Sequence, residues 1–296
     1  MSAFDPLQTL RLAVTIADMA RSTFLAIAFA ACFACTPSKR VVQPERDQVA
    51  FFERPVALAT ARKSGIPAPV IVALKSDPWS MVIGSDSPTF AMYEDGTVIR
   101  RLGDGYISSH LTRSEQVDLL NRLKPISLQR WYGRLNALPG VTDQPNQDLL
   151  LYTGGLPIFV SVYGSLDTAA VRSVIPQEVI DAYDELKAFK APGRPWLPDY
   201  IEVMISPYNN APEASIKWPA DFPGLNDTKT IKRSDDQMSI FVPSSRYDEL
   251  RSFLKHQNER GAVEIGGSKW SPILRLPFPQ EQLWMAPNPE SRKLKR

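Results

Sequence analysis

Proline is the residue that most limits what this chain can fold into. The sequence has 26 prolines among 296 residues, about 9% where about 5% is usual. Proline fixes the backbone φ angle and has no amide hydrogen, so it ends helices and interrupts sheets. Seven of the prolines lie within residues 192–223. We therefore expect a linker at 191–199 and a long loop at 207–225.

Three pairs of short apolar runs are separated by turn residues and predict β-hairpins. The first pair spans 90–100 and turns at Asp95-Gly96, where glycine supplies the positive φ of a tight turn. The second and third pairs turn at Gly-Gly and span 149–163 and 262–276. Single strands are predicted at 70–74, 81–83, 200–205 and 239–242.

Three helices are predicted between these strands. The first begins at a capping box, Thr112-x-x-Glu115, and ends at Pro125. The second runs from 176 to about 189, and the third begins at a similar box that starts with Ser245. The predicted apolar faces are Val117, Leu120 and Leu123 in the first helix, Ile175, Val179, Tyr183 and Leu186 in the second, and Tyr247, Leu250, Phe253 and Leu254 in the third.

These elements predict an α+β fold of hairpin–helix units, with mainly antiparallel sheets and two small packed subdomains. A hydrophobic fraction of 44% is enough for a packed core. The predicted organisation is a leader at 1–35, a tether at 36–54, an N-terminal subdomain at 55–190, a linker at 191–199, a C-terminal subdomain at 200–286 and a flexible tail at 287–296.

An uninterrupted run of small apolar residues at 24–34 predicts an export signal. The run is shorter than the ~20 residues that a spanning helix needs, but it matches the apolar segment of a signal peptide. Arg21 precedes it and supplies the positive charge expected there. Because residues 1–18 fit a signal poorly, we expect translation to start at Met19.

The apolar run ends in two cysteines, Cys32 and Cys35, and no cysteine follows. Residues 29–32, Phe-Ala-Ala-Cys, resemble the lipobox of bacterial lipoproteins, whose cysteine is lipidated and becomes the first mature residue. We expect lipidation at Cys32, because Cys35 fits the pattern less well. A simple secretory signal cleaved near Ala30 and a redox Cys-x-x-Cys pair remain open as alternatives. Phe33, where aspartate would retain a lipoprotein at the inner membrane, favours the outer membrane.

Charge and composition exclude several classes of protein. A net charge of +2 provides no basic footprint for nucleic acid, so no such partner is expected. Two histidines and two cysteines are too few for a multi-ligand zinc or haem site, so no metal or cofactor is expected. We assign no catalytic residue, because the G-x-S-x-G elbow is absent and the S-x-x-K at Ser252 lacks the companion motifs of penicillin-recognising enzymes.

Aromatic residues near the proline-rich segments define a candidate ligand groove. Aromatic and proline side chains can line grooves that bind peptide or sugar. Alternatively, they can cover the backbone of a loop without binding any ligand. The loop at 207–225 would form one wall of the groove. Its candidate residues are Trp196, Tyr208, Trp218, Phe222 and Trp270.

Several turn motifs occur together along the chain: Tyr93-x-Asp95-Gly96-x-Val98-Ile99, Thr142-Asp143-x-Pro145, Trp218-Pro219, and Gly266-Gly267 before an aromatic strand that ends in Pro277-Phe278-Pro279. In this set the chain resembles a group of uncharacterised exported bacterial proteins, over about residues 80–285. The resemblance implies an architecture and an exported location, but no activity.

The sequence therefore predicts an exported, lipid-anchored envelope protein of a non-enzymatic binding or scaffolding type, in the outer membrane and facing the periplasm. Its partners would be the membrane, through the lipid, and a protein, peptide or glycan. One alternative is a carboxylate-dependent periplasmic hydrolase, and another is an inhibitor or immunity-type protein that presents loop 207–225. Clustered carboxylates with raised pKa in a cleft would favour the hydrolase, and a flat exposed apolar patch would favour partner binding.

Overall fold

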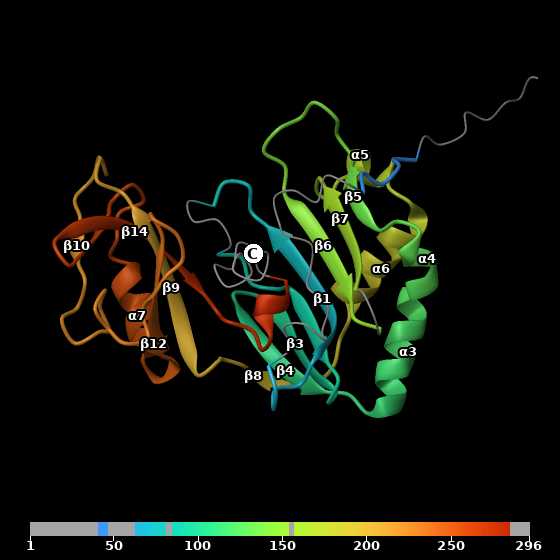
Figure 1. The fold of residues 1–296 in the computed structure, drawn as a ribbon, viewed down its shortest axis with the longest axis horizontal. Coiled ribbons are helices and arrows are strands. Elements are labelled where there is room, and N and C mark those ends of the chain that lie inside the picture. Colours follow the sequence, from blue (N-terminus) through green and yellow to red (C-terminus); the bar gives the residue numbers. More distant parts are fainter. Residues whose placement is uncertain (1–40, 47–62, 81–84, 154–156, 285–296) are drawn as a thin grey trace, which may run out of the picture. The chain divides into compact units, whose positions relative to one another are not determined.

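The computed structural model describes residues 41–46, 63–80, 85–153 and 157–284 (Figure 1). These residues contain five α-helices and 14 strands, which form one sheet of eight strands and one of six. Among the described strands two neighbouring pairs are parallel and the others are antiparallel. The α+β fold with mainly antiparallel sheets is therefore confirmed.

The first sheet contains the first two predicted hairpins. Its strand order is β5-β7-β6-β1-β2-β3-β4-β8. The turn at Asp95-Gly96 forms as predicted, and Gly96 has a φ of 88°. The strands are β1 (Pro69–Ser76), β2 (Phe90–Tyr93), β3 (Thr97–Leu102), β4 (Gly105–His110), β5 (Gly133–Asn136), β6 (Asn146–Leu151), β7 (Ile158–Tyr163) and β8 (Arg194–Pro195).

Four helices accompany the first sheet: α3 (Arg113–Leu123), α4 (Pro125–Gln129), α5 (Ala169–Arg172) and α6 (Gln177–Ala188). Figure 1 shows α3, α4 and α6 on one side of this sheet. Because successive side chains of a strand point to opposite faces, every second strand residue meets the helices. Ile71 and Val160 from the strands join Leu119 and Val179 from the helices in one buried core.

The second core of the first sheet lies on its other face and includes the C-terminal segment. Phe278, Leu283 and Trp284 are buried there against Val72 and other strand residues. The 3-10 helix η2 (Glu281–Leu283) belongs to this segment. The predicted boundary, which placed all of 200–286 in a C-terminal subdomain, is therefore wrong beyond about residue 277. The linker differs too, because its residues 194–195 form β8 and pair with β4.

The second sheet has the order β10-β13-β14-β9-β12-β11 and contains the third predicted hairpin, β13 with β14. Helix α7 (Tyr247–Leu254), which follows the 3-10 helix η1 (Ser244–Arg246), packs on it through the buried Leu250. The strands are β9 (Tyr200–Pro207), β10 (Ile216–Lys217), β11 (Ile231–Lys232), β12 (Met238–Pro243), β13 (Val263–Ile265) and β14 (Ser268–Arg275).

The first helix is capped as predicted, but its buried face is rotated. Thr112 and Glu115 form both hydrogen bonds of a capping box. The buried residues are Gln116, Leu119 and Leu123, whereas Val117 is 41% exposed. The sequence pattern excluded Gln116 from the core because its side chain is polar. The amide of Gln116 turns inward because its Nε2 donates to the carbonyl of Leu111 at 3.2 Å.

The predicted capping box at Ser245 does not form. Helix α7 begins after Arg246, and no side chain caps it. The neighbouring Ser244 instead donates a hydrogen bond to the carbonyl of Pro198, which lies just before β9. A contact distant in sequence has therefore displaced the local cap.

Some predicted segments lie outside the described residues: the leader 1–35, the strand 81–83, the tail 287–296 and most of the tether 36–54. Residues 41–46 of the predicted tether are described, and they are hydrogen-bonded to the folded domain. Glu45 and Arg134 exchange backbone hydrogen bonds of 2.7 and 3.2 Å, and the amide of Val42 donates to Val174. Residues 41–46 therefore lie beside β5.

Candidate functional site

A cavity lies between helix α6 and the first sheet. Val179 and Leu186 of α6 face the strands, and after the helix ends Phe189 packs edge-on against Phe90 of β2, with ring centroids 5.2 Å apart. The space between these contacts has a volume of about 260 Å³. Its apolar lining consists of Ala73, Leu74, Phe90, Leu149, Val160, Val162, Leu166, Val179, Leu186 and Phe189.

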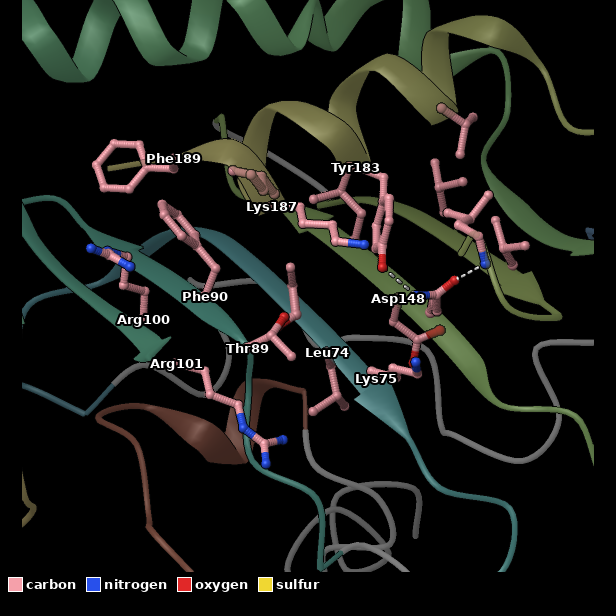
Figure 2. A pocket seen from close by; sticks show the side chains of 18 residues that line it. Leu74, Lys75, Thr89, Phe90, Arg100, Arg101, Asp148, Tyr183, Lys187 and Phe189 are labelled. Atoms are coloured by element: carbon pink, nitrogen blue, oxygen red, sulfur yellow. Dashed lines mark hydrogen bonds between the residues drawn. The ribbon is translucent and has the colours of Figure 1, made fainter. Parts of the chain in front are cut away.

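A short chain of hydrogen bonds forms the polar part of this cavity (Figure 2). Gln147 Nε2 donates to the Tyr183 hydroxyl at 3.0 Å, and that hydroxyl donates to Asp167 Oδ1 at 3.2 Å. Gln147 Oε1 accepts a hydrogen bond from the amide of Leu166. Burial raises the pKa of Tyr183. These bonds hold the tyrosine and the amide in place. The other polar side chains that line the cavity include Arg100 and Lys187.

Two lysines beside the cavity are bridged by one carboxylate. Asp167 accepts hydrogen bonds from Lys187 of α6 and from Lys75 of β1, the latter at 3.3 Å. The hydrogen bond from Lys187 lowers the pKa of Asp167 most, burial opposes that shift, and the hydrogen bond from Lys75 lowers the pKa further. Because the Asp167 side chain is 39% exposed, this bridge contributes little to stability. It does link α6 to β1 across the opening.

Asp148 lines the same region but lies on the other face of the sheet. It alternates with Leu149, which belongs to the core beneath the helices, and Figure 2 shows its carboxyl directed away from α6. It is 5% exposed, and its Oδ1 has no hydrogen-bond partner among the described residues. Burial raises its pKa to about 6, although the Ser161 hydroxyl and Arg134 oppose that shift.

A second, polar cleft of about 550 Å³ joins the loop after β1 to β14 and α7. Asp86 lines it, and burial raises the pKa of this carboxyl to about 6, although the hydrogen bond from the Asp77 amide opposes that shift. Trp79, 73% exposed, stands beside them. The other polar lining residues are Lys75, Ser80, Ser85, Ser87, Thr89, Arg101, Asp104, Tyr106, Tyr247 and Arg275.

The candidate groove residues do not come together. Trp218 and Phe222 pack on each other, with centroids 5.4 Å apart, in the core beneath α7. Trp196 packs instead with Tyr106 and Phe278, and none of the five lines the cavity or the cleft. Trp218 and Trp270 donate their indole hydrogens to the carbonyls of Pro223 and Ile265, and the amide of Tyr208 donates to the carbonyl of Lys269.

The loop at 207–225 is therefore packed locally by its own aromatic side chains. Strand β10, inside it, pairs with β13. The predicted lipidation sites, Cys32 and Cys35, lie outside the described residues.

Sequence reasoning missed the residues that line the cavity, above all Arg100, Tyr183 and Lys187. Tyr183 was assigned to an apolar face without a polar role, and the lysine and arginine resemble ordinary solvated side chains in sequence. Asp148 carried a detectable signal, because a carboxylate directly before the apolar run Leu149–Leu151 falls within a buried strand.

The described residues contain no group of three or more histidine, cysteine or acidic side chains that could hold a metal ion. No helix in the described ranges is both long and apolar enough to cross a membrane. Comparisons with protein-family models, with curated proteins and with solved structures found no match.

Proposed function

We propose that this chain is an exported, lipid-anchored envelope protein that binds a small ligand with an apolar part in the cavity beneath α6. The cavity carries the proposal, because packed protein interiors leave few voids larger than a water molecule. A volume of about 260 Å³ lies just below the usual range of small-molecule sites. Its apolar walls and its few fixed polar groups are the composition of such sites.

The location rests on the sequence alone. The apolar run at 24–34 ends at Cys32, where lipidation would anchor the chain without a spanning helix. The full chain expressed in a bacterium should yield a mature N-terminus at an acylated Cys32, detected by mass spectrometry. Cys32→Ala should abolish acylation, and Cys35→Ala should not. An unmodified mature N-terminus would refute the anchor.

Ligand binding is tested by filling the cavity. The neutral fluorescent amine N-phenylnaphthylamine should bind the full chain, and decanol should displace it. Ala73→Phe places a ring in the cavity and should weaken binding at least roughly tenfold, since added core volume is accommodated poorly. Ala188→Phe, at an exposed position of α6, is the control, because it adds the same ring outside the cavity. Unchanged binding to a folded Ala73→Phe protein would contradict the proposal.

The polar cleft supports a second candidate function, a carboxylate-dependent hydrolase. Asp86 carries it, because a carboxyl with a pKa of about 6 in a cleft suits a general acid. The full chain would then release nitrophenol from nitrophenyl glycosides or esters, with activity falling as the pH rises through about 6. Asp86→Asn should remove this activity and Asp104→Asn, also in the cleft, should not. No release from either class of substrate would exclude this function.

A further inference from the structure

A basic depression lies beside the cavity beneath α6. It has a volume of about 590 Å³, and its lining includes Arg100, Arg101, Lys187 and Lys190. None of the described residues that line it is acidic. Figure 2 shows Arg101 directed away from α6, so its guanidinium lies on the far side of the sheet. The cations on the near side are therefore Arg100, Lys187 and Lys190.

The depression and the cavity share a wall. Arg100, Lys187 and Phe189 line both of them. Arg100 is the cross-strand neighbour of Phe90, and the rings of Phe90 and Phe189 pack together at this end of the cavity (Figure 2). A single molecule can therefore extend from an apolar space into a positively charged one.

Arg100 is only weakly paired among the described residues. Its Nη2 donates only to the carbonyl of Ala191, at a long 3.4 Å, and its buried Nε has no hydrogen-bond partner among the described residues. A buried donor without a partner is costly, and a charged one more so. Lys187, in contrast, is bridged by Asp167. An anion near Arg100 would supply the missing acceptor.

We propose, resting on the proposed function, that the ligand is a single-chain amphiphile with an anionic head group. Its chain occupies the apolar cavity, and its head lies in the depression against Arg100 and Lys190. The uncompensated positive charge favours an anion over a neutral or cationic head. The carboxyl of Asp148 does not oppose it, because that side chain lies on the other face of the sheet.

The inference is tested with amphiphiles that share one chain and differ in the head. Isothermal titration of the full chain compares decyl phosphate, decanoate, decanol and decyltrimethylammonium, and inorganic phosphate alone. We expect decyl phosphate or decanoate to bind at least roughly tenfold more tightly than decanol, since hydrogen bonds to charged groups are the strong ones. The tighter of the two anions identifies the head as phosphate or carboxylate. Higher salt should weaken the binding of the two anions and leave the binding of decanol unchanged.

Two variants locate the head group. Arg100→Gln should weaken binding of the anion roughly 10- to 100-fold and leave decanol unchanged, with Arg113→Gln in the exposed first turn of α3 as its control. Because Arg100 is partly buried, Lys190→Gln at an exposed position provides a second test that spares the fold. Lys190→Gln should lower the affinity for the anion about two- to fivefold, as loss of an exposed ion pair does. Lys255→Gln, at another exposed position, should leave the affinity unchanged.

The outcomes separate this inference from the proposed function. Equal affinity for decanol and for both anions would overturn the anionic head group and leave the cavity as a ligand site. Inorganic phosphate that binds as tightly as decyl phosphate would overturn the amphiphile. Binding of none of the amphiphiles would overturn both proposals.

Discussion

At the scale of single residues, Asp148 shows what a buried carboxyl costs this fold. Its neighbours are Ser161 and Arg134, and the carboxyl of Asp86 is close enough to raise its pKa further. Burial is the largest effect, so the folded protein holds this proton more tightly than the unfolded chain does. The stability that follows is fully present below the ordinary pKa of 3.8 and is lost as the pH rises through about 6.

Asp148→Asn should remove this loss. The free energy of unfolding of the variant, relative to that of the parent protein, should rise by roughly 2–3 kcal/mol between about pH 4 and about pH 7, since one pKa unit corresponds to about 1.4 kcal/mol. Urea unfolding of both proteins across this range measures it. Asp235→Asn, at a side chain 98% exposed, should leave the pH dependence as it is. A constant difference between Asp148→Asn and its parent would show that Asp148 does not titrate in this window.

At the scale of elements, local sequence rules succeeded where no distant contact competed with them. The three hairpins, the single strands predicted at 70–74, 200–205 and 239–242, and the cap of α3 follow from residues within a few positions of each other, and they formed as predicted. The buried face of α3 differs because Gln116 turns inward and donates to the carbonyl of Leu111, only five residues away. No side chain caps α7, and Ser244, next to the predicted cap, donates instead to the distant carbonyl of Pro198. Propensity sets such choices only until a tertiary hydrogen bond outweighs it.

The contrast between the formed cap at Thr112 and the predicted but missing cap at Ser245 can be measured. Thr112→Ala should lower the free energy of unfolding by about 1 kcal/mol, because it removes the side-chain acceptor for the amide of Glu115. Ser245→Ala should change it by less than about 0.5 kcal/mol, since no side chain caps α7. Urea unfolding near neutral pH compares both variants with their parent. Equal losses in the two variants would contradict the assigned caps.

At the scale of the whole molecule, residues 276–284, which follow β14 of the second sheet, pack against the first sheet and so connect the two sheets. Arg275, at the end of β14, pairs with Glu202 of β9 and with Glu281 of η2. Three residues later Phe278 enters the core of the first sheet, 5.3 Å from the ring of Tyr106. Tyr93 of β2 donates to the carbonyl of Pro279 at 3.1 Å. The described strands of both sheets lie within one compact unit, residues 41–296.

Phe278→Ala should therefore destabilise the protein as a whole. A buried phenylalanine replaced by alanine costs about 3–5 kcal/mol, and Phe278 is 3% exposed. Hydrogen exchange followed by mass spectrometry should show faster exchange in β1 and β2 as well as in β9. Ile126→Ala, at a side chain 90% exposed, is the control and should change little. Faster exchange confined to the second sheet would refute this coupling.

The candidate site was less predictable than the fold. The cavity beneath α6 is formed by β1, β2, β3, β6, β7 and the residues from 179 to 189, and no local pattern brings these together. The groove predicted from aromatic residues assumed that Trp196, Trp218 and Trp270 would face a ligand. Their indole rings instead pack against the core of the second sheet, and Trp196 also packs against the core formed by the C-terminal segment. Trp218 lies within the long loop, whose backbone must be covered by its own side chains.

The sequence by itself determined the class of fold, the strand pairs of the three hairpins and the second helix, because these depend on contacts between near neighbours. The export signal and the lipidation site are also inferred from a short local pattern, and they stay predictions. Only the tertiary structure decided that the C-terminal segment returns to the first sheet, that Asp148 is buried, and that Arg100 lines a cavity with no acidic partner among the described residues. Burial and electrostatic pairing depend on residues far apart in the chain, and no short pattern records which of them meet.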